Sequence, residues 1–471
     1  MMKVRIALTV LLAAAALTTV ERPDGVVHAA RLAVDAQQDE FALALSNVAT
    51  HPHIGLPNFI VTGGGADQAK AATTIADVLW SDIQFEREYD MIPRPRSASI
   101  PVAPAAVLPF DQWSDLGADF VLAGTARFTS ATAVTIELRL VGVKGAGRGK
   151  EYFGMQYDCG LQTARGPRDC AHAIADDFHK QKRNLDGVAR TKLAFSSNRD
   201  ALRVTGRPTN TSGQGKEIYL SDYDGANQLR FTVNRSLNIN PSWSPSGSAL
   251  AYTSYVSGFP DIYVANLAEP GRALARPAHG NDQVQNQLPA WSPDGTKLAF
   301  MSNRSGNNDI WIVNRDGSDL HNLTNTPSAN DGAPTWNPAG DKLAFTSDRT
   351  GSNQLYVVTA AGTGLQRLPI NQKVDRPTWS RLNFIAFTLE TSSGHDIAIY
   401  DFNNPGVKIL TDGVGSNESP TIAPNGRHIA FVTTRWGRKQ LAIIDRTGQN
   451  IQKITDVGDN EHPTWQPFAI K

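Results

Sequence analysis

Cysteine is scarce in this chain: Cys159 and Cys170 are the only two among 471 residues. They stand eleven residues apart in a polar stretch that also contains Gly166 and Pro167. In an oxidising compartment, two thiols at this spacing predict one local disulfide. A zinc site is less favoured, because zinc usually takes four ligands and His172 is the only imidazole close by. Free buried thiols are the remaining alternative.

An excess of charge of either sign is also missing. The chain has 45 basic and 45 acidic side chains, so its formal net charge is zero. Nucleic acids and acidic membranes attract proteins that carry a surplus of cations. The balance therefore argues against both and favours other proteins as partners. An apolar content of 41% is ordinary for a soluble globular protein, and the length allows two sizeable domains.

Long apolar runs are absent after the first twenty residues. Lys3 and Arg5 precede an uncharged run over residues 6–20, and small residues follow, among them Ala16 and Ala29. This order is typical of a secretory signal, whereas a membrane anchor needs roughly 20 strongly apolar residues. We expect residues 1–30 to be a signal and unstructured start, cleaved after Ala16 or Ala29, so that the mature chain is exported.

Motifs that would indicate an enzyme are missing as well. The sequence contains no G-x-S-x-G nucleophile elbow. It also lacks the H-E-x-x-H zinc motif and the G-x-x-x-x-G-K-[ST] phosphate loop. Gly145, Gly147 and Gly149 resemble a phosphate cradle, but a flexible hairpin between strands explains them more simply. The sequence therefore predicts no catalytic residues, no cofactor and no metal site.

What is present is a repeat. Six copies of a P-x-W-S-P-D-G pattern, each followed by short apolar runs, occupy the last part of the chain. They begin at Pro241, Pro289, Pro334, Pro377, Pro420 and Pro463, in steps of 48, 45, 43, 43 and 43 residues. A period in the forties with several strand signals per unit is typical of propeller blades. The sequence therefore predicts a mainly β fold with a six-bladed β-propeller.

The two ends of the repeat region complete each other. The last copy stops after its first strand, near Trp465, whereas the region opens around Phe195 with what should be a second strand. Pairing these segments would close the ring and remove its open sheet edges. We therefore expect residues 189–471 to form a propeller closed by the C-terminal strand.

Five of the nine tryptophans recur at one position of this repeat. They are Trp243, Trp291, Trp336, Trp379 and Trp465, with Ile422 in the remaining copy. An aromatic cage is one interpretation. Packing between blades is the better one, because large rings at a wedge position dominate core energetics.

Residues 31–188 have a different pattern, in which helix and strand signals alternate as in a small α/β domain. Strands are expected over residues 58–61, 120–124 and 132–143, and helices over 69–80 and 172–182. Five prolines in residues 93–109 predict a loop. Residues 21–57 show no clear period.

Polar residues precede the anchoring proline in every copy, so they should surround one mouth of the central channel. They are Asn238, Asn240, Gln285, Asn286, Asn330, Asp331, Asp375, Arg376, Asn417, Glu418, Glu461 and His462. Such loops on a rigid scaffold could bind a loop or helix end of a partner protein. The alternative is that Asn and Asp merely favour turns. Because four of these residues are acidic and Arg376 is the only arginine, we expect a basic or neutral partner surface.

Two further strings make the chain resemble the TolB family: LGADFVLAG at residues 116–124, and SDYDGANQ at residues 221–228, near the start of the repeat region. Together with the six repeats and the domain order, the resemblance covers nearly all of the expected mature chain. It implies a monomeric periplasmic component of the Tol-Pal system, which supports envelope integrity and cell division. It also implies that the Pal lipoprotein binds at a propeller mouth and that TolA contacts a segment at the mature N-terminus. Some family members are used by imported bacteriocins.

Two other classes stay open from the residues alone. A carbohydrate-binding or sensor propeller of the envelope would use the same mouth for a small ligand. An accessory propeller of a peptidase system would need a hydrolase domain, and no hydrolase motif occurs in this sequence.

Overall fold

The structure is a computed structural model that describes residues 28–31, 51–200, 215–270, 273–280 and 283–468. The chain divides into two compact units, residues 1–189 and 190–471. Most of the expected signal, up to residue 27, lies outside the described residues. Within the described ranges, no helix is long and apolar enough to cross a membrane.

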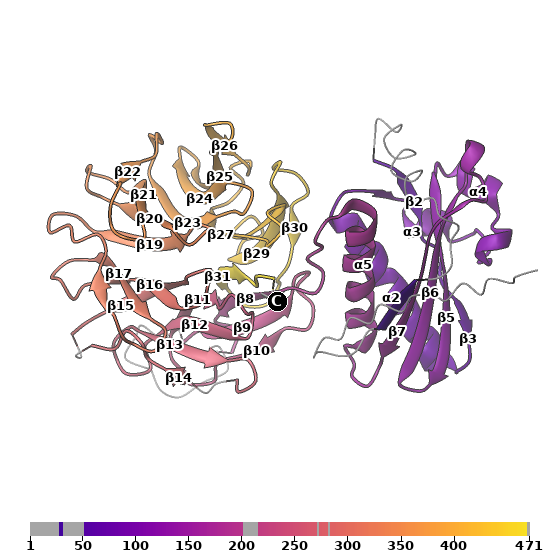
Figure 1. Cartoon of the computed structure of the whole chain (residues 1–471), viewed down its shortest axis with the longest axis horizontal. Helices are drawn as coiled ribbons and strands as arrows, with labels where there is room; N and C mark the ends of the chain where they lie inside the picture. The colour runs from indigo at the N-terminus through magenta and orange to yellow at the C-terminus, as the bar shows by residue number, and fades with distance from the viewer. Residues whose placement is uncertain (1–27, 32–50, 201–214, 271–272, 281–282, 469–471) are drawn as a thin grey trace, which may run out of the picture. The chain divides into compact units, whose positions relative to one another are not determined.

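The first unit contains a seven-stranded sheet in the order β1-β7-β6-β5-β2-β4, with β3 paired to β5 (Figure 1). The strands are β1 (His28–Arg31), β2 (His53–Gly55), β3 (Ile60–Thr62), β4 (Asp90–Met91), β5 (Phe120–Ser130), β6 (Ala133–Gly142) and β7 (Glu151–Gly160). The helical segments are α2 (Ala66–Phe85), α3 (Arg94–Ser97), η1 (Ala105–Val107), α4 (Phe110–Asp115), η2 (Gly145–Gly147) and α5 (Gly166–Arg183).

Helices α2 and α5 pack against each other, and α5 also contacts β7. Helix α2 buries Ile75, Leu79 and Ile83, which are spaced four residues apart and therefore share one face. Helix α5 ends at Asn184, whose left-handed backbone (φ 48°) is typical of a helix C-terminus. The expected small α/β domain is therefore present.

Two segments of this unit differ from the sequence-based expectation. Residues 21–57 lacked a period, yet β1 and β2 lie within them and pair with β7 and β5. Residues 93–109 were expected to be a loop but include α3 and η1. Such short elements are stabilised by sheet pairing and by proline in a first helical turn, as in α3. Periodicity over two to four residues is too short to reveal them.

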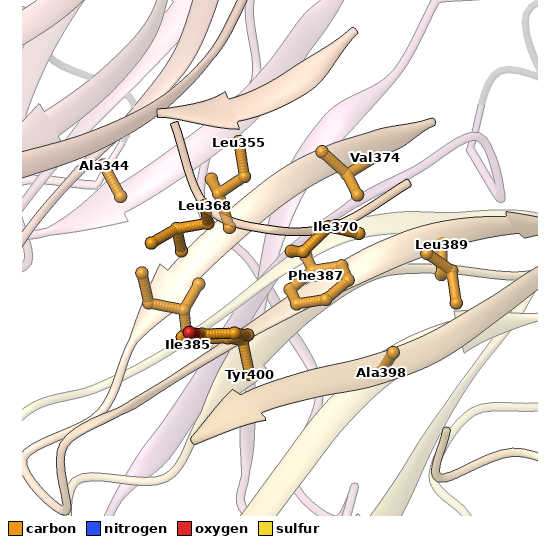
Figure 2. Packing of buried hydrophobic residues seen from close by; sticks show 10 residues of the cluster. All are labelled: Ala344, Leu355, Leu368, Ile370, Val374, Ile385, Phe387, Leu389, Ala398 and Tyr400. Carbon is orange, nitrogen blue, oxygen red and sulfur yellow. The ribbon is translucent and has the colours of Figure 1, made fainter. Parts of the chain in front are cut away.

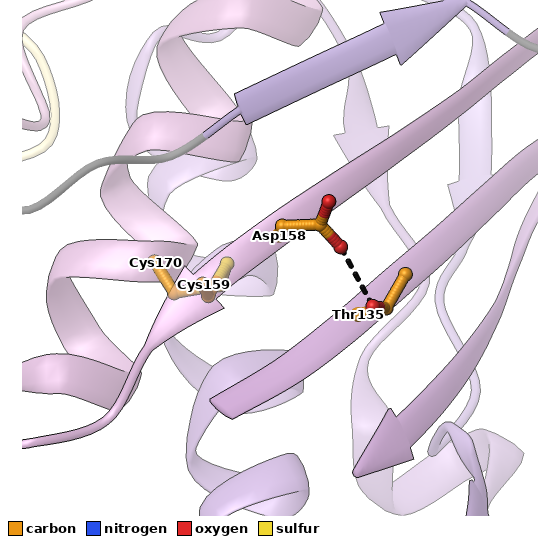
Figure 3. Close-up of a disulfide and its surroundings, with 4 residues drawn as sticks. All are labelled: Thr135, Asp158, Cys159 and Cys170. Carbon is orange, nitrogen blue, oxygen red and sulfur yellow. Dashed lines mark hydrogen bonds between the residues drawn. A yellow bond between two sulfur atoms is a disulfide. The ribbon is translucent and has the colours of Figure 1, made fainter. Parts of the chain in front are cut away.

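A disulfide joins Cys159, near the end of β7, to Cys170 in α5 (Figure 3). Both side chains are buried, and the neighbouring Asp158 accepts a 2.6 Å hydrogen bond from Thr135 on β6. The cross-link therefore ties the sheet to the helix that covers it.

The second unit consists of six four-stranded antiparallel sheets. Blade 1 is β11 (Asn238–Trp243), β12 (Ala249–Ser254), β13 (Asp261–Asn266) and β14 (Ala273–Ala275); blade 2 is β15 (Asn286–Trp291), β16 (Lys297–Ser302), β17 (Asp309–Asn314) and β18 (His321–Asn322). Blade 3 is β19 (Asp331–Trp336), β20 (Lys342–Ser347), β21 (Gln354–Thr359) and β22 (Gln366–Arg367); blade 4 is β23 (Val374–Trp379), β24 (Phe384–Thr391), β25 (Gly394–Asp401) and β26 (Val407–Ile409). Blade 5 is β27 (Asn417–Ile422), β28 (His428–Thr433), β29 (Gln440–Asp445) and β30 (Gln452–Lys453).

Blade 6 combines the two ends of the repeat region. Its strands are β31 (Asn460–Trp465), β8 (Lys192–Ser197), β9 (Glu217–Asp222) and β10 (Leu229–Arg230). Strand β31 pairs antiparallel with β8, with Trp465 opposite Leu193 and Asn460 opposite Ser197. The predicted closure of a six-bladed ring by the C-terminal strand is confirmed, and it satisfies backbone groups that would otherwise form open edges.

The propeller core lies between successive blades. Figure 2 shows one cluster in which Leu355 of blade 3 packs with Ile385 and Phe387 of blade 4. Each sheet is sandwiched on both faces, which explains why its middle strands are continuously apolar. The recurrent tryptophans belong to this packing, because Trp243 and Trp336 donate their indole N–H to carbonyls of the preceding blade's first strand at 3.1 and 3.2 Å.

Candidate functional site at the mouth of the ring

The first strand of each blade lines the centre, and these six inner strands contact one another in the ring order β11, β15, β19, β23, β27, β31. Because neighbouring strands run antiparallel, all inner strands begin on one face of the ring. The loops between second and third strands and the connections to the next blade open on that same face. We call it the mouth face. All twelve residues expected at the mouth lie on it.

Five of the twelve are buried: Asn240, which is 7% exposed, and four residues that begin inner strands. Asn238, Asn286, Asp331 and Asn417 occupy the first position of their inner strands and are at most 1% exposed. The three amides donate to carboxylates at the start of the third strand in the preceding blade. These bonds run from Asn238 to Glu217 (2.9 Å), from Asn286 to Asp261 (2.9 Å) and from Asn417 to Asp396 (3.1 Å).

Asp331 is buried for a related reason: both of its carboxylate oxygens accept from the Arg349 guanidinium at 3.0 Å. The three amides therefore link neighbouring blades, whereas Asp331 forms an ion pair within blade 3. These four side chains were expected at the surface of the mouth, but they are buried and have a structural role.

Four other members of the set are at the surface. Gln285 and Asn330 are exposed, and the side chains of Asp375 and Glu418 are 53% and 33% exposed. Asn330 is held by Asp348, to which its amide donates at 3.1 Å. These side chains are positioned by the loops that carry them.

The acidic excess expected at the mouth is partly offset by cations that sequence reasoning missed. Glu461 forms ion pairs with Lys216 and with Lys439 (2.6 Å). Burial would raise the pKa of Glu461, but these two ammonium groups lower it to about 2. Glu418 lies 3.3 Å from the His395 imidazole. The acidic excess behind the expectation of a basic or neutral partner surface is therefore smaller than the sequence indicated, and that expectation stays a prediction.

Lys216, His395 and Lys439 share a place in the repeat. Each immediately precedes the buried polar residue at the top of a third strand: Glu217, Asp396 and Gln440. Aligning the blades at their third strands, in addition to the prolines, would have revealed this second polar ring.

The third position of each inner strand faces the channel. Its six residues are Asn240, Leu288, Ala333, Arg376, Ser419 and His462, all with φ between 48° and 58°. Every inner strand also has a register shift at this point. A bulge of this kind redirects a side chain.

Arg376 uses this geometry to reach across the ring. Its Nη1 donates to Asn240 Oδ1 at 2.7 Å, although the two residues belong to blades 4 and 1, which are opposite. The nearby His462 is partly buried. Burial and the Arg376 charge lower its pKa well below the usual value, so its imidazole is neutral at pH 7.

Apolar side chains are exposed on the same face, on the part of the ring that runs from the start of blade 5 through blade 6 to blade 1. Six large hydrophobic residues on mouth-face loops are 40–60% exposed: Val233, Val256, Phe259, Val414, Trp436 and Val457. An apolar set with an exposed tryptophan and phenylalanine beside polar groups resembles the composition of protein interfaces.

No group of His, Cys, Asp and Glu side chains in the described parts of the chain is arranged to hold a metal ion. The mouth can therefore offer hydrogen bonds, ion pairs and apolar contacts, which are the chemistry of binding.

Comparison with known proteins identifies both units. The family model of the TolB amino-terminal domain matches residues 45–148, and that of the TolB beta propeller domain matches residues 186–469. The Tol-Pal system protein TolB of Bordetella avium is 35% identical over 401 residues, which cover 84% of each chain. That of Desulfosudis oleivorans is 32% identical over 221 residues.

The match to the Desulfosudis oleivorans protein spans 45% of that protein, and the chain likewise spans about half the length of several other curated relatives. Among solved structures, TolB from Acinetobacter baumannii superposes with a TM-score of 0.70 at 21% identity, over 89% of this chain and 97% of that one. This likeness supports the fold. On the two domain matches and the Bordetella avium relative, the chain belongs to the TolB family.

Proposed function

We propose that this chain is a non-catalytic protein–protein interaction scaffold of the Tol-Pal envelope system in the periplasm. Its mouth face would bind the Pal-like peptidoglycan-associated lipoprotein of the same organism. In that role it would support outer-membrane integrity and cell division, and imported bacteriocins could use the same surface. The observation that carries the proposal is the exposure of six large apolar side chains on the loops of the mouth face, which also carries the polar residues at the channel entrance.

The mouth face has the two components that stable docking requires. Exposed Trp436 and Phe259 are suited to enter pockets of a partner, as aromatic hot-spot residues commonly do. The polar residues Gln285, Asn330 and Asp375 would form the hydrogen-bonding rim. The loops that carry these residues are anchored on a closed ring, so little ordering is needed on binding.

A capture experiment tests this surface. The purified full chain would be immobilised and its affinity for the soluble domain of the lipoprotein measured, for the wild type and for Phe259→Ala with Trp436→Ala. We expect the double variant to weaken binding by about 30-fold or more, because a hot-spot truncation costs roughly 2 kcal/mol or more.

The matched control is Leu320→Ala with Leu365→Ala, which removes two exposed apolar side chains from turns on the opposite face of the ring. This variant should bind like the wild type. Equal losses in both variants would contradict the mouth as the docking surface. Saturable binding of peptidoglycan sugar fragments, without capture of the lipoprotein, would favour the carbohydrate-binding alternative.

We also infer that residues 1–30 direct export and that a segment near the mature N-terminus contacts TolA. A fusion of residues 1–35 to a reporter that is active only outside the cytoplasm should be active. Retention of that fusion in the cytoplasm would refute the signal. For TolA, deletion of the residues between the cleavage site and residue 50 should abolish capture of its C-terminal domain while leaving lipoprotein binding intact.

A further inference from the structure

The channel entrance contains a cation without a carboxylate partner inside the channel. Arg376 carries five N–H donors, and its bond across the channel goes to the neutral amide oxygen of Asn240. The carboxylate nearest to it, on Asp375, is 3.9 Å from Nε and is 53% exposed, beyond the range of a good hydrogen bond. Carboxylates of the described residues therefore act on this charge through space, but none of them accepts a hydrogen bond from the guanidinium.

The other acids of the mouth are already engaged. Glu461 is paired with Lys216 and Lys439. Glu418 accepts from Ser416 at 2.5 Å and lies beside His395. Both carboxylates act on the Arg376 charge through space, but neither forms a hydrogen bond with its guanidinium.

A second polar side chain at the channel entrance also has a hydrogen-bonding atom that is not used. His462 Nδ1 is buried and makes no hydrogen bond to any described residue. His462 lies on β31, the strand next to β11. Asn240, Arg376 and His462 each occupy the third position of their inner strand. The residues at that position on either side of Arg376 are Ala333 and Ser419, the smallest of the six. Three hydrogen-bonding groups thus converge beside small neighbours.

We propose that the channel entrance is a receptor for one carboxylate, carried as an Asp or Glu side chain on a loop of the docked partner. Arg376 releases Asn240 and binds both oxygens of the incoming carboxylate in the paired geometry that guanidinium favours. The freed Asn240 amide and the His462 imidazole complete the site. The inference rests on the proposed function, because exposed apolar side chains on the same face, such as Phe259, indicate a protein loop as the carrier.

The first test uses the lipoprotein. Its affinity would be measured for the wild type, Arg376→Gln and Arg376→Lys, with Arg446→Gln, an exposed arginine on the opposite face, as the matched control. We expect Arg376→Gln to lose about 10- to 100-fold, because hydrogen bonds to charged groups are worth that much. The lysine variant should lose less, and the control nothing. Arg376→Gln should melt close to the wild type, since the partly buried guanidinium makes no close ion pair within the chain.

A double-mutant cycle then identifies the carboxylate. Each Asp and Glu of the lipoprotein would be changed to its amide, and one such change should weaken binding to the wild type but have no further effect on Arg376→Gln. Unchanged affinity of Arg376→Gln, or additive losses for every acid, would overturn the proposal.

The second test does not depend on the lipoprotein. Sodium acetate would replace sodium chloride at constant ionic strength while the His462 side-chain NMR signal, assigned with His462→Gln, is followed. A saturable shift with acetate, absent with acetamide and lost in Arg376→Gln, is the expected result. An equal response to chloride would indicate an adventitious anion only, and no response would refute the receptor. If acetate binds but the lipoprotein does not, the proposed function fails and the carboxylate site stands.

Discussion

Replacing Glu461 with glutamine should destabilise the propeller in a way that depends on pH. The carboxylate is 12% exposed and lies between Lys216 and Lys439. Its pKa falls from the usual 4.5 to about 2, because the two ammonium groups outweigh the opposing effect of burial. A pKa that is lower in the folded state by this amount corresponds to about 3 kcal/mol of stability at pH 7.

The direction of the pH dependence follows from the depressed pKa. The stabilisation is complete above the unfolded-state pKa near 4.5 and is lost as the pH falls toward 2. At pH 3, roughly 1.5 kcal/mol should remain. The difference in unfolding free energy between wild type and Glu461→Gln should therefore shrink by about half between pH 7 and pH 3.

Urea unfolding followed by tryptophan fluorescence measures this difference. Seven of the nine tryptophans lie in residues 190–471, and Trp465 is on the same strand as Glu461, so the signal reports mainly on the ring. The control is Glu390→Gln, whose ion pair with Lys373 joins side chains that are 47% and 58% exposed. An exposed pair of this kind is worth about 0–1 kcal/mol. Equal effects of the two substitutions at pH 7, or a Glu461→Gln effect that does not change down to pH 3, would refute the reasoning.

Three other perturbations test the ring and the first unit. Asp331→Asn leaves the Arg349 guanidinium without its carboxylate and should lower the free energy of unfolding in urea by about 3–5 kcal/mol, as breakage of buried ion pairs does. A loss below about 1 kcal/mol would contradict a stabilising role of the Asp331–Arg349 pair. Ending the chain before residue 460 removes the strand that completes blade 6. Limited proteolysis should then cut the propeller faster, because the edge of blade 6 is exposed. Unchanged resistance to the protease would argue against ring closure as a source of stability. Changing Cys159 and Cys170 together to serine should lower the stability of the first unit by about 3 kcal/mol, as expected for a disulfide that closes a loop of this length. Thermal melting followed by circular dichroism would compare the variant with the oxidised and the reduced wild type. Coincident melting of all three samples would refute the prediction.

Much of the fold could be predicted from the residues. The six prolines and the recurrent tryptophans predict the blades, because each blade repeats the same turn residues and the same apolar runs. The closure of blade 6 by the strand around Trp465 followed from the incomplete final repeat. Strand β1 and helix α3 were not predictable, since segments of four residues have no readable period and depend on the sheet or core beside them.

The candidate site was less predictable than the fold. The repeat identified the correct face of the ring. The twelve residues expected at the mouth, however, included both buried Asn286 and exposed Asp375, which occupy neighbouring positions in different copies of the repeat. Alternation along a strand would assign their directions in a regular ladder. Each inner strand has a bulge before its proline, so this alternation fails where it matters.

The sequence by itself determined the number of blades, their order and the segment that seals the ring, because local turn and strand signals recur at a fixed period. Only the tertiary structure decided which polar residues hold the blades together and which reach the channel. It alone pairs Lys216 with Glu461, 245 residues away, and brings Arg376 to Asn240 across the ring. Such contacts depend on the curvature of a closed circle, which no stretch of sequence encodes locally.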